Sequence, residues 1–443
     1  MREPAKSLVE TVARGDAGAL ARVLRRIAGR NVALDAEALE RAAKIVEDVR
    51  RRGDAALVDY ARQFDGVEMR PAELRVGEEG LRRAAARANA HVLAALRESI
   101  KQVRAFHEFE RQESWEVETA NGVRLGQRVA PVGGAGLYVP GGTASYPSSV
   151  VMNVVPAQVA GVSRVVVTTP PRALDESPAV SAALVELGVT EVYAVGGAQA
   201  LAALAYGTET VPRVDVITGP GNKYVAAAKK LVFGAVGIDS IAGPTEVVVV
   251  ADETARADFV AADMLAQAEH GEDASAVLIT TSDALALATA RELARQARDL
   301  PRRPVVEQSL ARYGAIIVVG GAGEACALVN ELAPEHLEII ARGEQEIADG
   351  VRNAGAIFFG AHAPEAVGDY IAGPNHVLPT GGAARFSSAL GVGNFLKRTS
   401  VIRYTRAELE RTAPMIAALA GAEGLDAHAR SAMIRLERGE PDA

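Results

Sequence analysis

Apolar residues recur at three- and four-residue spacing through the first third of the chain. One such stripe follows Asp35, a plausible helix N-cap, and reaches a possible interruption at Gly53. A second stripe runs through residues 78–110. Because this spacing places apolar side chains on one face of a helix, it predicts two long amphipathic scaffold helices.

After Trp115 the pattern changes to short β segments and then to a repeated unit. Each unit has a Val/Ile-rich run, a Gly-containing turn and an Ala-rich helical pattern. Apolar runs that alternate with helices are typical of parallel strands covered on both faces, so we expect a doubly wound α/β fold. The runs are residues 165–169, 192–195, 214–218, 247–250, 276–280, 315–319 and 356–359.

The alternation stops near Phe386. Two helical patterns, over residues 406–420 and 425–438, finish the chain. A helical tail of this kind must dock on its own subunit or on a neighbour. Upstream, the turns at 195–200 and 319–325 resemble each other, which suggests an internal duplication.

The composition narrows the class of protein. Hydrophobic residues make up 49% of the 443 residues and aromatics only 4%, so the core must consist mostly of Ala, Val, Leu and Ile. A net charge of −8 without blocks of like charge argues against a nucleic-acid binder. Prolines and glycines interrupt the longest uncharged stretch, residues 129–163, so we expect no membrane-spanning helix. Because charged, amphipathic sequence follows Met1, we also expect no signal peptide. With Cys326 alone no internal disulfide is possible, and we expect a soluble, cytoplasmic protein.

The glycine-rich turns do not contain a complete dinucleotide fingerprint. The segments 219–224 and 321–326 each have only the first two glycines of G-x-G-x-x-G. The turn Gly219-Pro-Gly-Asn222 nevertheless follows a predicted strand and opens a helix, where free backbone amides suit a phosphate. A tight strand-to-helix turn without a ligand is the alternative.

Two pairs of polar residues are candidates for chemistry. Gln267 and His270 lie three apart near a helix end and could share one metal ion, although a helix-end histidine stabilised by the dipole is the simpler interpretation. Pro334 places Glu335 and His336 at a predicted strand start, where two general bases could have separate tasks. A surface carboxylate beside a half-buried histidine is the alternative.

Taken together, the motifs resemble those of the histidinol dehydrogenase family. Nine segments occur in the family's order from about residue 130 to the end, and the length also fits. They are Gly136–Thr143, Gly196–Ala200, Gly219–Asn222, Ala242–Glu246, Gln267–Gly271, Ala333–Leu337, Gly368–Tyr370, Asn375–Thr380 and Glu423–His428.

The resemblance implies an architecture of two incomplete Rossmann-like domains in an intertwined homodimer. The domains expected are an N-terminal helical segment (1–30), a discontinuous α/β domain with the metal and catalytic loops (31–137 and 246–385), an NAD-side domain (138–245) and a helical tail (386–443). The tail would reach the partner's site, so that active sites are shared across the dimer.

The resemblance also implies the reaction, which is a zinc-dependent oxidation of L-histidinol to L-histidine by two hydride transfers to NAD through a bound aldehyde. His336 would accept the alcohol proton, and Glu335 would activate the water that hydrates the aldehyde. The zinc ligands implied are Gln267, His270, Asp369 and His428. The NAD contacts implied are Tyr138, Gln199 and Asn222. The substrate contacts implied are Thr245, Gln267, His270, His336, Asp369, His376, Glu423 and His428.

Three alternatives remain open on the sequence. A zinc hydrolase would use Glu335 to activate a metal-bound water without NAD. A catalytically inactive paralogue would only bind metal or a partner, although every implied ligand and base is present. A donor set of nitrogen and oxygen also suits manganese as well as zinc.

Overall fold

The computed structural model describes residues 7–30, 36–141 and 146–437, so the expected N-cap Asp35 lies outside the described residues. The chain divides into two units. The first comprises residues 1–110 and 132–395, and the second comprises residues 111–131 and 396–443. Every helix of the described ranges is too short or too polar to span a lipid bilayer.

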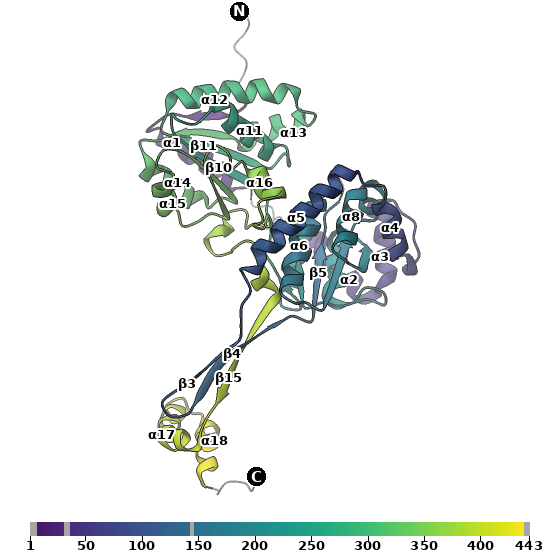
Figure 1. Cartoon of the computed structure of the whole chain (residues 1–443), viewed down its shortest axis with the longest axis vertical. Coiled ribbons are helices and arrows are strands. Elements are labelled where there is room, and N and C mark those ends of the chain that lie inside the picture. The colour runs from purple at the N-terminus through teal and green to yellow at the C-terminus, as the bar shows by residue number, and fades with distance from the viewer. Residues whose placement is uncertain (1–6, 31–35, 142–145, 438–443) are drawn as a thin grey trace, which may run out of the picture. The chain divides into compact units, whose positions relative to one another are not determined.

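The first unit contains two six-stranded sheets. We name one the β10 sheet; its order is β1-β12-β11-β10-β13-β14, and all its strands are parallel. Helices α11, α12 and α13 pack on one face, and α1, α14 and α15 on the other (Figure 1). The strands are β1 (Glu10–Val12), β10 (Glu246–Ala251), β11 (Ser275–Thr280), β12 (Ala315–Val318), β13 (His336–Ile340) and β14 (Ala356–Phe359). The helices are α1 (Ala17–Ala28), α11 (Ala257–Ala268), α12 (Asp283–Gln296), α13 (Arg303–Tyr313), α14 (Ala322–Leu332), α15 (Glu344–Gly350) and α16 (Glu365–Tyr370).

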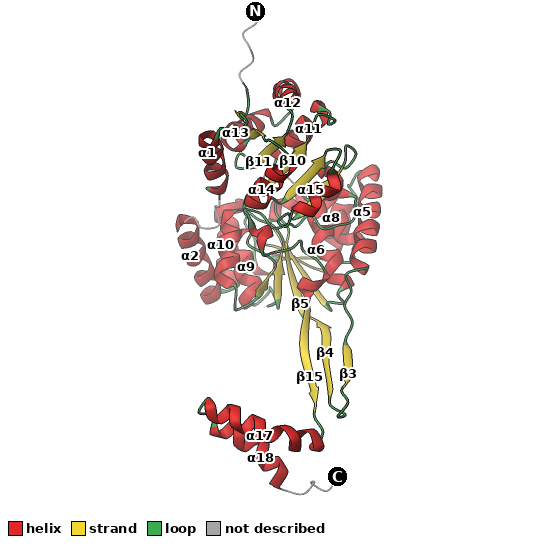
Figure 2. Ribbon diagram, turned by 90° about the vertical axis from the view of Figure 1, so that its left-hand side faces the viewer, coloured by secondary structure: helices red, strands yellow, loops and turns green. Residues whose placement is uncertain are grey.

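The other sheet, which we name the β5 sheet, has the order β2-β7-β6-β5-β8-β9, and only β2 is antiparallel. Helices α2, α9 and α10 lie on one face, and α5, α6 and α8 on the other (Figure 2). The strands are β2 (Arg75–Val76), β5 (Gly134–Tyr138), β6 (Arg164–Thr169), β7 (Glu191–Ala194), β8 (Val216–Thr218) and β9 (Gly237–Ile238). The helices are α2 (Ala36–Arg52), α3 (Asp54–Tyr60), α4 (Glu78–Ala85), α5 (Ala90–Glu108), α6 (Pro147–Val159), α7 (Pro171–Glu176), α8 (Pro178–Glu186), α9 (Gly197–Tyr206) and α10 (Lys223–Val232).

The two sheets share one strand order. Numbered along the chain, β5 to β9 and β10 to β14 both follow the order 3-2-1-4-5. The expected α/β architecture with parallel strands is therefore confirmed. The two similar turns of the sequence follow β7 and β12, which are the third strands of their sheets.

The expected first domain differs from the observed sheets. Residues 31–137 were assigned with 246–385, but β2 and most of β5 belong to the sheet of residues 164–238. The helices between them also pack on that sheet. An apolar stripe predicts that one face of a helix is buried, but it does not specify against which sheet. The pattern alone therefore could not assign these helices to the β5 sheet or to the β10 sheet. The segment 1–30 is likewise not only helical, because β1 pairs with β12 at the edge of the β10 sheet.

The expected scaffold helices are interrupted. The first ends before Gly53, whose φ of +55° allows α3 to start in a new direction. The second is divided into α4 and α5, because the side chain of Asn89 accepts a hydrogen bond from the backbone of His91 and so caps a new helix.

The second unit is an antiparallel ribbon that carries two helices. Its strand order is β15-β4-β3, and the paired strands run side by side in Figures 1 and 2. The two terminal helical patterns are confirmed as α17 and α18, but β15 was not predicted, because its partner lies some 270 residues earlier in the chain. The elements are β3 (Trp115–Glu118), β4 (Arg124–Pro131), β15 (Leu396–Arg403), α17 (Arg406–Ala422) and α18 (Asp426–Glu437).

Candidate active site

Glu335 and His336 lie side by side at the amino end of β13, in the middle of the β10 sheet. His336 is paired in register with Val247 of the neighbouring strand β10. Both side chains are buried, and His336 Nδ1 lies 3.7 Å from Glu335 Oε2. The expected strand start behind Pro334 is therefore confirmed.

Two donors from the start of β10 hold the carboxyl group of Glu335. The hydroxyl of Thr245 and the backbone N–H of Glu246 both donate to Glu335 Oε2, at 2.5 and 3.0 Å. Gln267 Nε2 donates to the same hydroxyl at 2.9 Å, so Thr245 links the amide of Gln267 to the carboxyl group of Glu335. Burial nevertheless raises the pKa of Glu335 to about 8.

The imidazole of His336 is held as a neutral base. Burial lowers the pKa of His336 to about 4, against the opposing effect of Asp369. Its Nδ1 lies 3.2 Å from the carbonyl oxygen of Glu246. Because a carbonyl only accepts hydrogen bonds, Nδ1 carries the proton and Nε2 keeps its lone pair. This tautomer can accept a proton from a substrate.

Three of the expected metal ligands lie in the first unit around this pair. Gln267 is in the last turn of α11, His270 directly follows that helix, and Asp369 is in α16. Ligand atoms of His336, Glu365 and Asp369 all lie within 4.8 Å of one another. His270 acts electrostatically on His336. These residues come from three elements and gather at one place.

The amide of Gln267 supports a cation at this place. Its side chain is completely buried, and among the described residues its Oε1 has no hydrogen-bond partner. An unpaired buried oxygen is costly unless a group outside the chain satisfies it. His270 Nδ1 is 3.1 Å from the carbonyl of Ala266, which leaves Nε2 available. A divalent ion with nitrogen and oxygen ligands fits this donor set.

His376 extends the cluster. Its Nδ1 lies 3.0 Å from the carbonyl oxygen of Asp369 and 3.8 Å from a carboxylate oxygen of the same residue. Burial lowers the pKa of His376, and Asp369 partly opposes this. The expected contact of His376 with substrate stays a prediction.

Glu423 and His428 are in the second unit. Glu423 is the C-cap of α17 and His428 lies in the first turn of α18, and both are exposed. Their role at the site stays a prediction.

The three residues expected to contact NAD line one cavity. Tyr138, Gln199 and Asn222 border a space of about 920 Å³ at the carboxyl ends of the β5 sheet. Tyr138 accepts a hydrogen bond from the backbone N–H of Gly197, and burial raises its pKa to about 12. Asn222 caps α10 through its side-chain oxygen, which receives the N–H groups of Tyr224 and Val225.

Backbone geometry explains the glycines at this cavity. A Cβ on Gly221 would lie 2.4 Å from Val225, and Gly197 has a φ of +63°. Side chains are excluded at both turns, which leaves the helix N-termini of α9 and α10 open to an anionic ligand.

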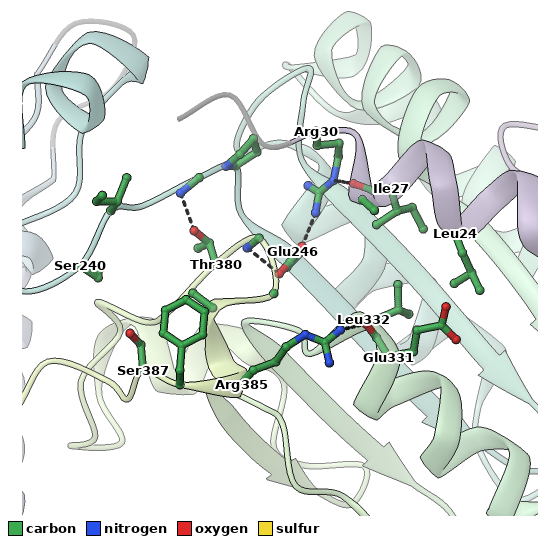
Figure 3. Close-up of a pocket in the computed structure, with 18 of the residues that line it drawn as sticks. Leu24, Ile27, Arg30, Ser240, Glu246, Glu331, Leu332, Thr380, Arg385 and Ser387 are labelled. Atoms are coloured by element: carbon green, nitrogen blue, oxygen red, sulfur yellow. Dashed lines mark hydrogen bonds and ion pairs between the residues drawn. The ribbon is translucent and has the colours of Figure 1, made fainter. Parts of the chain in front are cut away.

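Several polar residues of the site were not singled out from the sequence. Glu365 lies one helical turn before Asp369, and this spacing was the only available signal. Burial and neighbouring carboxylates raise its pKa well above the ordinary value. Arg30 and Glu246 form a buried ion pair beside a second cavity of about 1130 Å³ (Figure 3). Arg30 and Glu246 are more than two hundred residues apart in the sequence, so no local pattern could predict their ion pair.

Comparisons with known proteins identify the family of the chain. The family model for histidinol dehydrogenase matches residues 29–436. Histidinol dehydrogenase from Geobacillus kaustophilus is 55% identical over 397 residues, which cover 89% of this chain and 93% of that protein. The enzyme of that name from Synechococcus is 53% identical, over 88% of this chain and 91% of the relative.

A solved structure agrees over nearly the whole chain. Histidinol dehydrogenase from Elizabethkingia anophelis superposes with a TM-score of 0.90 at 33% identity, covering 97% of this chain and 98% of that one. With the matching family model and these relatives, the chain belongs to the histidinol dehydrogenase family.

Proposed function

We propose that the chain oxidises L-histidinol to L-histidine through bound L-histidinal, with two NAD per turnover and one zinc ion per subunit. The observation that carries this proposal is the buried pair Glu335 and His336. The backbone N–H and carbonyl of Glu246 hold the two side chains, and the amide of Gln267, which has an unpaired oxygen, is linked to Glu335 through Thr245. Two bases at one carbon atom are what an alcohol oxidation followed by an aldehyde oxidation requires.

The first oxidation needs a base for the alcohol proton. His336 Nε2 would take this proton, while bound NAD would accept the hydride from the substrate carbon. Because Nδ1 is bonded to the carbonyl of Glu246, the ring keeps its orientation through the transfer. The product of this step is the aldehyde.

The second oxidation needs water. Glu335 would remove a proton from the water molecule that adds to the aldehyde. The hydrate would then give its hydride to a second NAD and release its two hydroxyl protons, which leaves the carboxylate. Burial raises the pKa of Glu335 and so favours its protonated form. The base must be the carboxylate, which the N–H of Glu246 stabilises and a nearby cation would stabilise further.

Zinc and NAD would be held by chain residues already described. Gln267, His270 and Asp369, with His428 of a partner subunit, would hold the ion, and manganese would suit the same donors. When bound, zinc orients the substrate and NAD accepts hydride. Tyr138, Gln199 and Asn222 would contact NAD, and Thr245, His376 and Glu423 would complete the substrate contacts.

A homodimer with shared sites would complete the proposed ligand set, because Glu423 and His428 belong to the second unit. The second unit has little core of its own, since only Glu408, Ala413 and Ala420 are buried in α17. Large apolar side chains are exposed on the same unit, and such patches mark contact surfaces. They are Trp115, Val117, Leu125, Ile402, Tyr404, Met415 and Leu419.

The proposal is tested by the absorbance of reduced nicotinamide when zinc-loaded protein is mixed with L-histidinol and NAD. We expect two reduced nicotinamides for each histidine formed. A hydrolase would give no such signal, and its absence in zinc-supplemented protein would exclude the dehydrogenase activity.

The division of labour between the two bases is tested with Glu335→Gln. This change keeps the shape of the side chain but removes the base for water, so oxidation of L-histidinal should slow by about 10²-fold or more and oxidation of L-histidinol much less. Single-turnover rates with each substrate measure the two steps. Equal losses in both would show that Glu335 has no separate task.

A further inference from the structure

Residue 246 holds both bases through its own peptide groups. Its N–H donates to Glu335 Oε2 at 3.0 Å, and its carbonyl oxygen lies 3.2 Å from His336 Nδ1. A small rotation of this backbone segment would therefore displace the carboxyl and the imidazole together.

The side chain of Glu246 is anchored where this backbone begins. One carboxylate oxygen is bonded to the guanidinium of Arg30, and the other accepts the N–H of Gly381 at 3.0 Å. The side chains of Arg30 and Glu246 are only 3% and 8% exposed. Figure 3 shows the pair at the wall of the 1130 Å³ cavity, where dashed contacts from Arg30 and from the backbone N–H of Gly381 end at Glu246.

Arg30 also binds the backbone on either side of the pair. Its Nη1 donates to the carbonyl oxygens of Thr245 at 3.2 Å and Asp273 at 3.0 Å, and its Nε donates to Ile27. One planar guanidinium thus joins the end of α1, the start of β10 and the turn before β11. A lysine could not make these contacts at once, because it offers a single charged nitrogen.

We infer that Arg30 and Glu246 are positioning residues for both oxidation steps, which act by fixing the peptide groups of residue 246 against Glu335 and His336. The inference rests on the proposed roles of these two bases. The two can be distinguished by their kinetic effects. Loss of the Arg30–Glu246 pair should slow both oxidation steps by similar factors, whereas Glu335→Gln should slow mainly the oxidation of the aldehyde.

The test compares Arg30→Met, Arg30→Lys and the double variant Arg30→Met/Glu246→Gln with the wild-type protein. In Arg30→Met we expect both single-turnover rates to fall by about 10²-fold, the loss typical of catalytic groups misplaced by about 1 Å. Zinc content and NAD affinity should stay unchanged. Arg30→Lys keeps the charge, and should lose about tenfold in both steps.

The double variant separates positioning from stability. Arg30→Met alone leaves a carboxylate buried without its partner, which lowers the melting temperature. Adding Glu246→Gln removes that charge, so the melting temperature should return toward the wild-type value while both rates stay low. If activity returned together with stability, the pair would be merely structural and the inference would be overturned.

A matched control lies in the same segment. Arg26 forms an ion pair with Glu10 and has no contact with residue 246. Arg26→Met should leave both rates unchanged. A wild-type protein without activity on L-histidinol would refute the proposed function itself, whereas an active wild type with a fully active Arg30→Met variant would refute only the positioning role.

Discussion

Gly219 shows how single residues shape the cavity expected to hold NAD. Its φ is +113°, and an added Cβ would lie 2.1 Å from the carbonyl oxygen of Tyr138. Its N–H is held by Asp239 at 2.8 Å, and Lys229 is bonded to its carbonyl oxygen and to Asp239. Glycine allows the backbone conformation of this turn, and the bonds to Asp239 and Lys229 hold the turn in it.

We expect Gly219→Ala to lower the free energy of unfolding by more than the roughly 1–3 kcal/mol of backbone strain alone, and to weaken NAD binding. Chemical denaturation and NAD titration measure the two effects. Gly234→Ala is the matched control, since Gly234 has a φ of +100° but nothing within 4 Å of an added Cβ. Equal destabilisation by both changes would show that contact with Tyr138 is unimportant.

For single residues, the sequence predicts well which side chains lie at the site. It predicts less well which neighbours hold those side chains in place. Gln267, His270, Asp369 and His376 were selected from motifs, and the structure brings them together with Glu335 and His336. The anchoring residue Arg30 was missed, because its partners lie far away in sequence and an arginine in a polar helix end carries no pattern.

At the scale of elements, β13 presents chemistry on one face and apolar residues on the other. Leu337 and Ile339 pack in the core beneath α1 and α14, while Glu338 points the other way toward Asp263 of α11. Burial and this second carboxyl raise the pKa of Glu338. Its Oε1 accepts the N–H of Glu365 and so fixes the start of α16, the helix that carries Asp369.

The pKa of Glu338 is higher in the folded protein than the value of about 4.3 for a glutamate in the unfolded chain. Above that pH the folded protein therefore binds more protons than the unfolded one, and the free energy of unfolding falls as pH rises. Glu338→Gln removes this group, so the decrease in unfolding free energy between pH 5 and pH 8 should become smaller. Urea denaturation across this range is the measurement.

The exposed Glu253 provides the comparison for this prediction. Glu253→Gln should leave the pH dependence as in the wild type. An unchanged slope in Glu338→Gln would show that Glu338 is ionised in the folded protein.

Element order was predictable where local patterns specify it. The apolar runs gave the parallel strands, and the similar turns at 195–200 and 319–325 fall after the corresponding strands β7 and β12. Strand β15 was missed, since its charged and polar residues resemble a loop and only the distant β4 makes it a strand. The sheet covered by α2, α4 and α5 was assigned wrongly for the same reason, because pairing over long distances leaves no local trace.

At the scale of the whole molecule, the expected ligands are divided between the two units. Gln267, His270 and Asp369 belong to the first, and Glu423 and His428 to the second. If sites are shared across a dimer, each site needs the first unit of one subunit and the second unit of the other. This arrangement can be tested by complementation.

We expect His428→Ala to lower zinc occupancy and activity. Mixing it with Glu335→Gln should restore part of the activity, because one site of the mixed dimer then receives both intact contributions. Metal analysis and the nicotinamide assay after subunit exchange measure this. Confirmed exchange without recovered activity would mean that each subunit completes its own site.

Glu335 and His336 lie at the amino end of β13, next to the amino end of β10, although ligands of doubly wound sheets usually bind at the carboxyl ends. A small cavity of about 240 Å³ lies at the carboxyl edge of the same sheet, bordered by Ala251, Ile279 and Val319. Six residues of β10, about 20 Å at 3.3 Å each, separate the two edges. A fluorophore or affinity tag attached at the carboxyl edge would therefore report on the enzyme without disturbing its turnover.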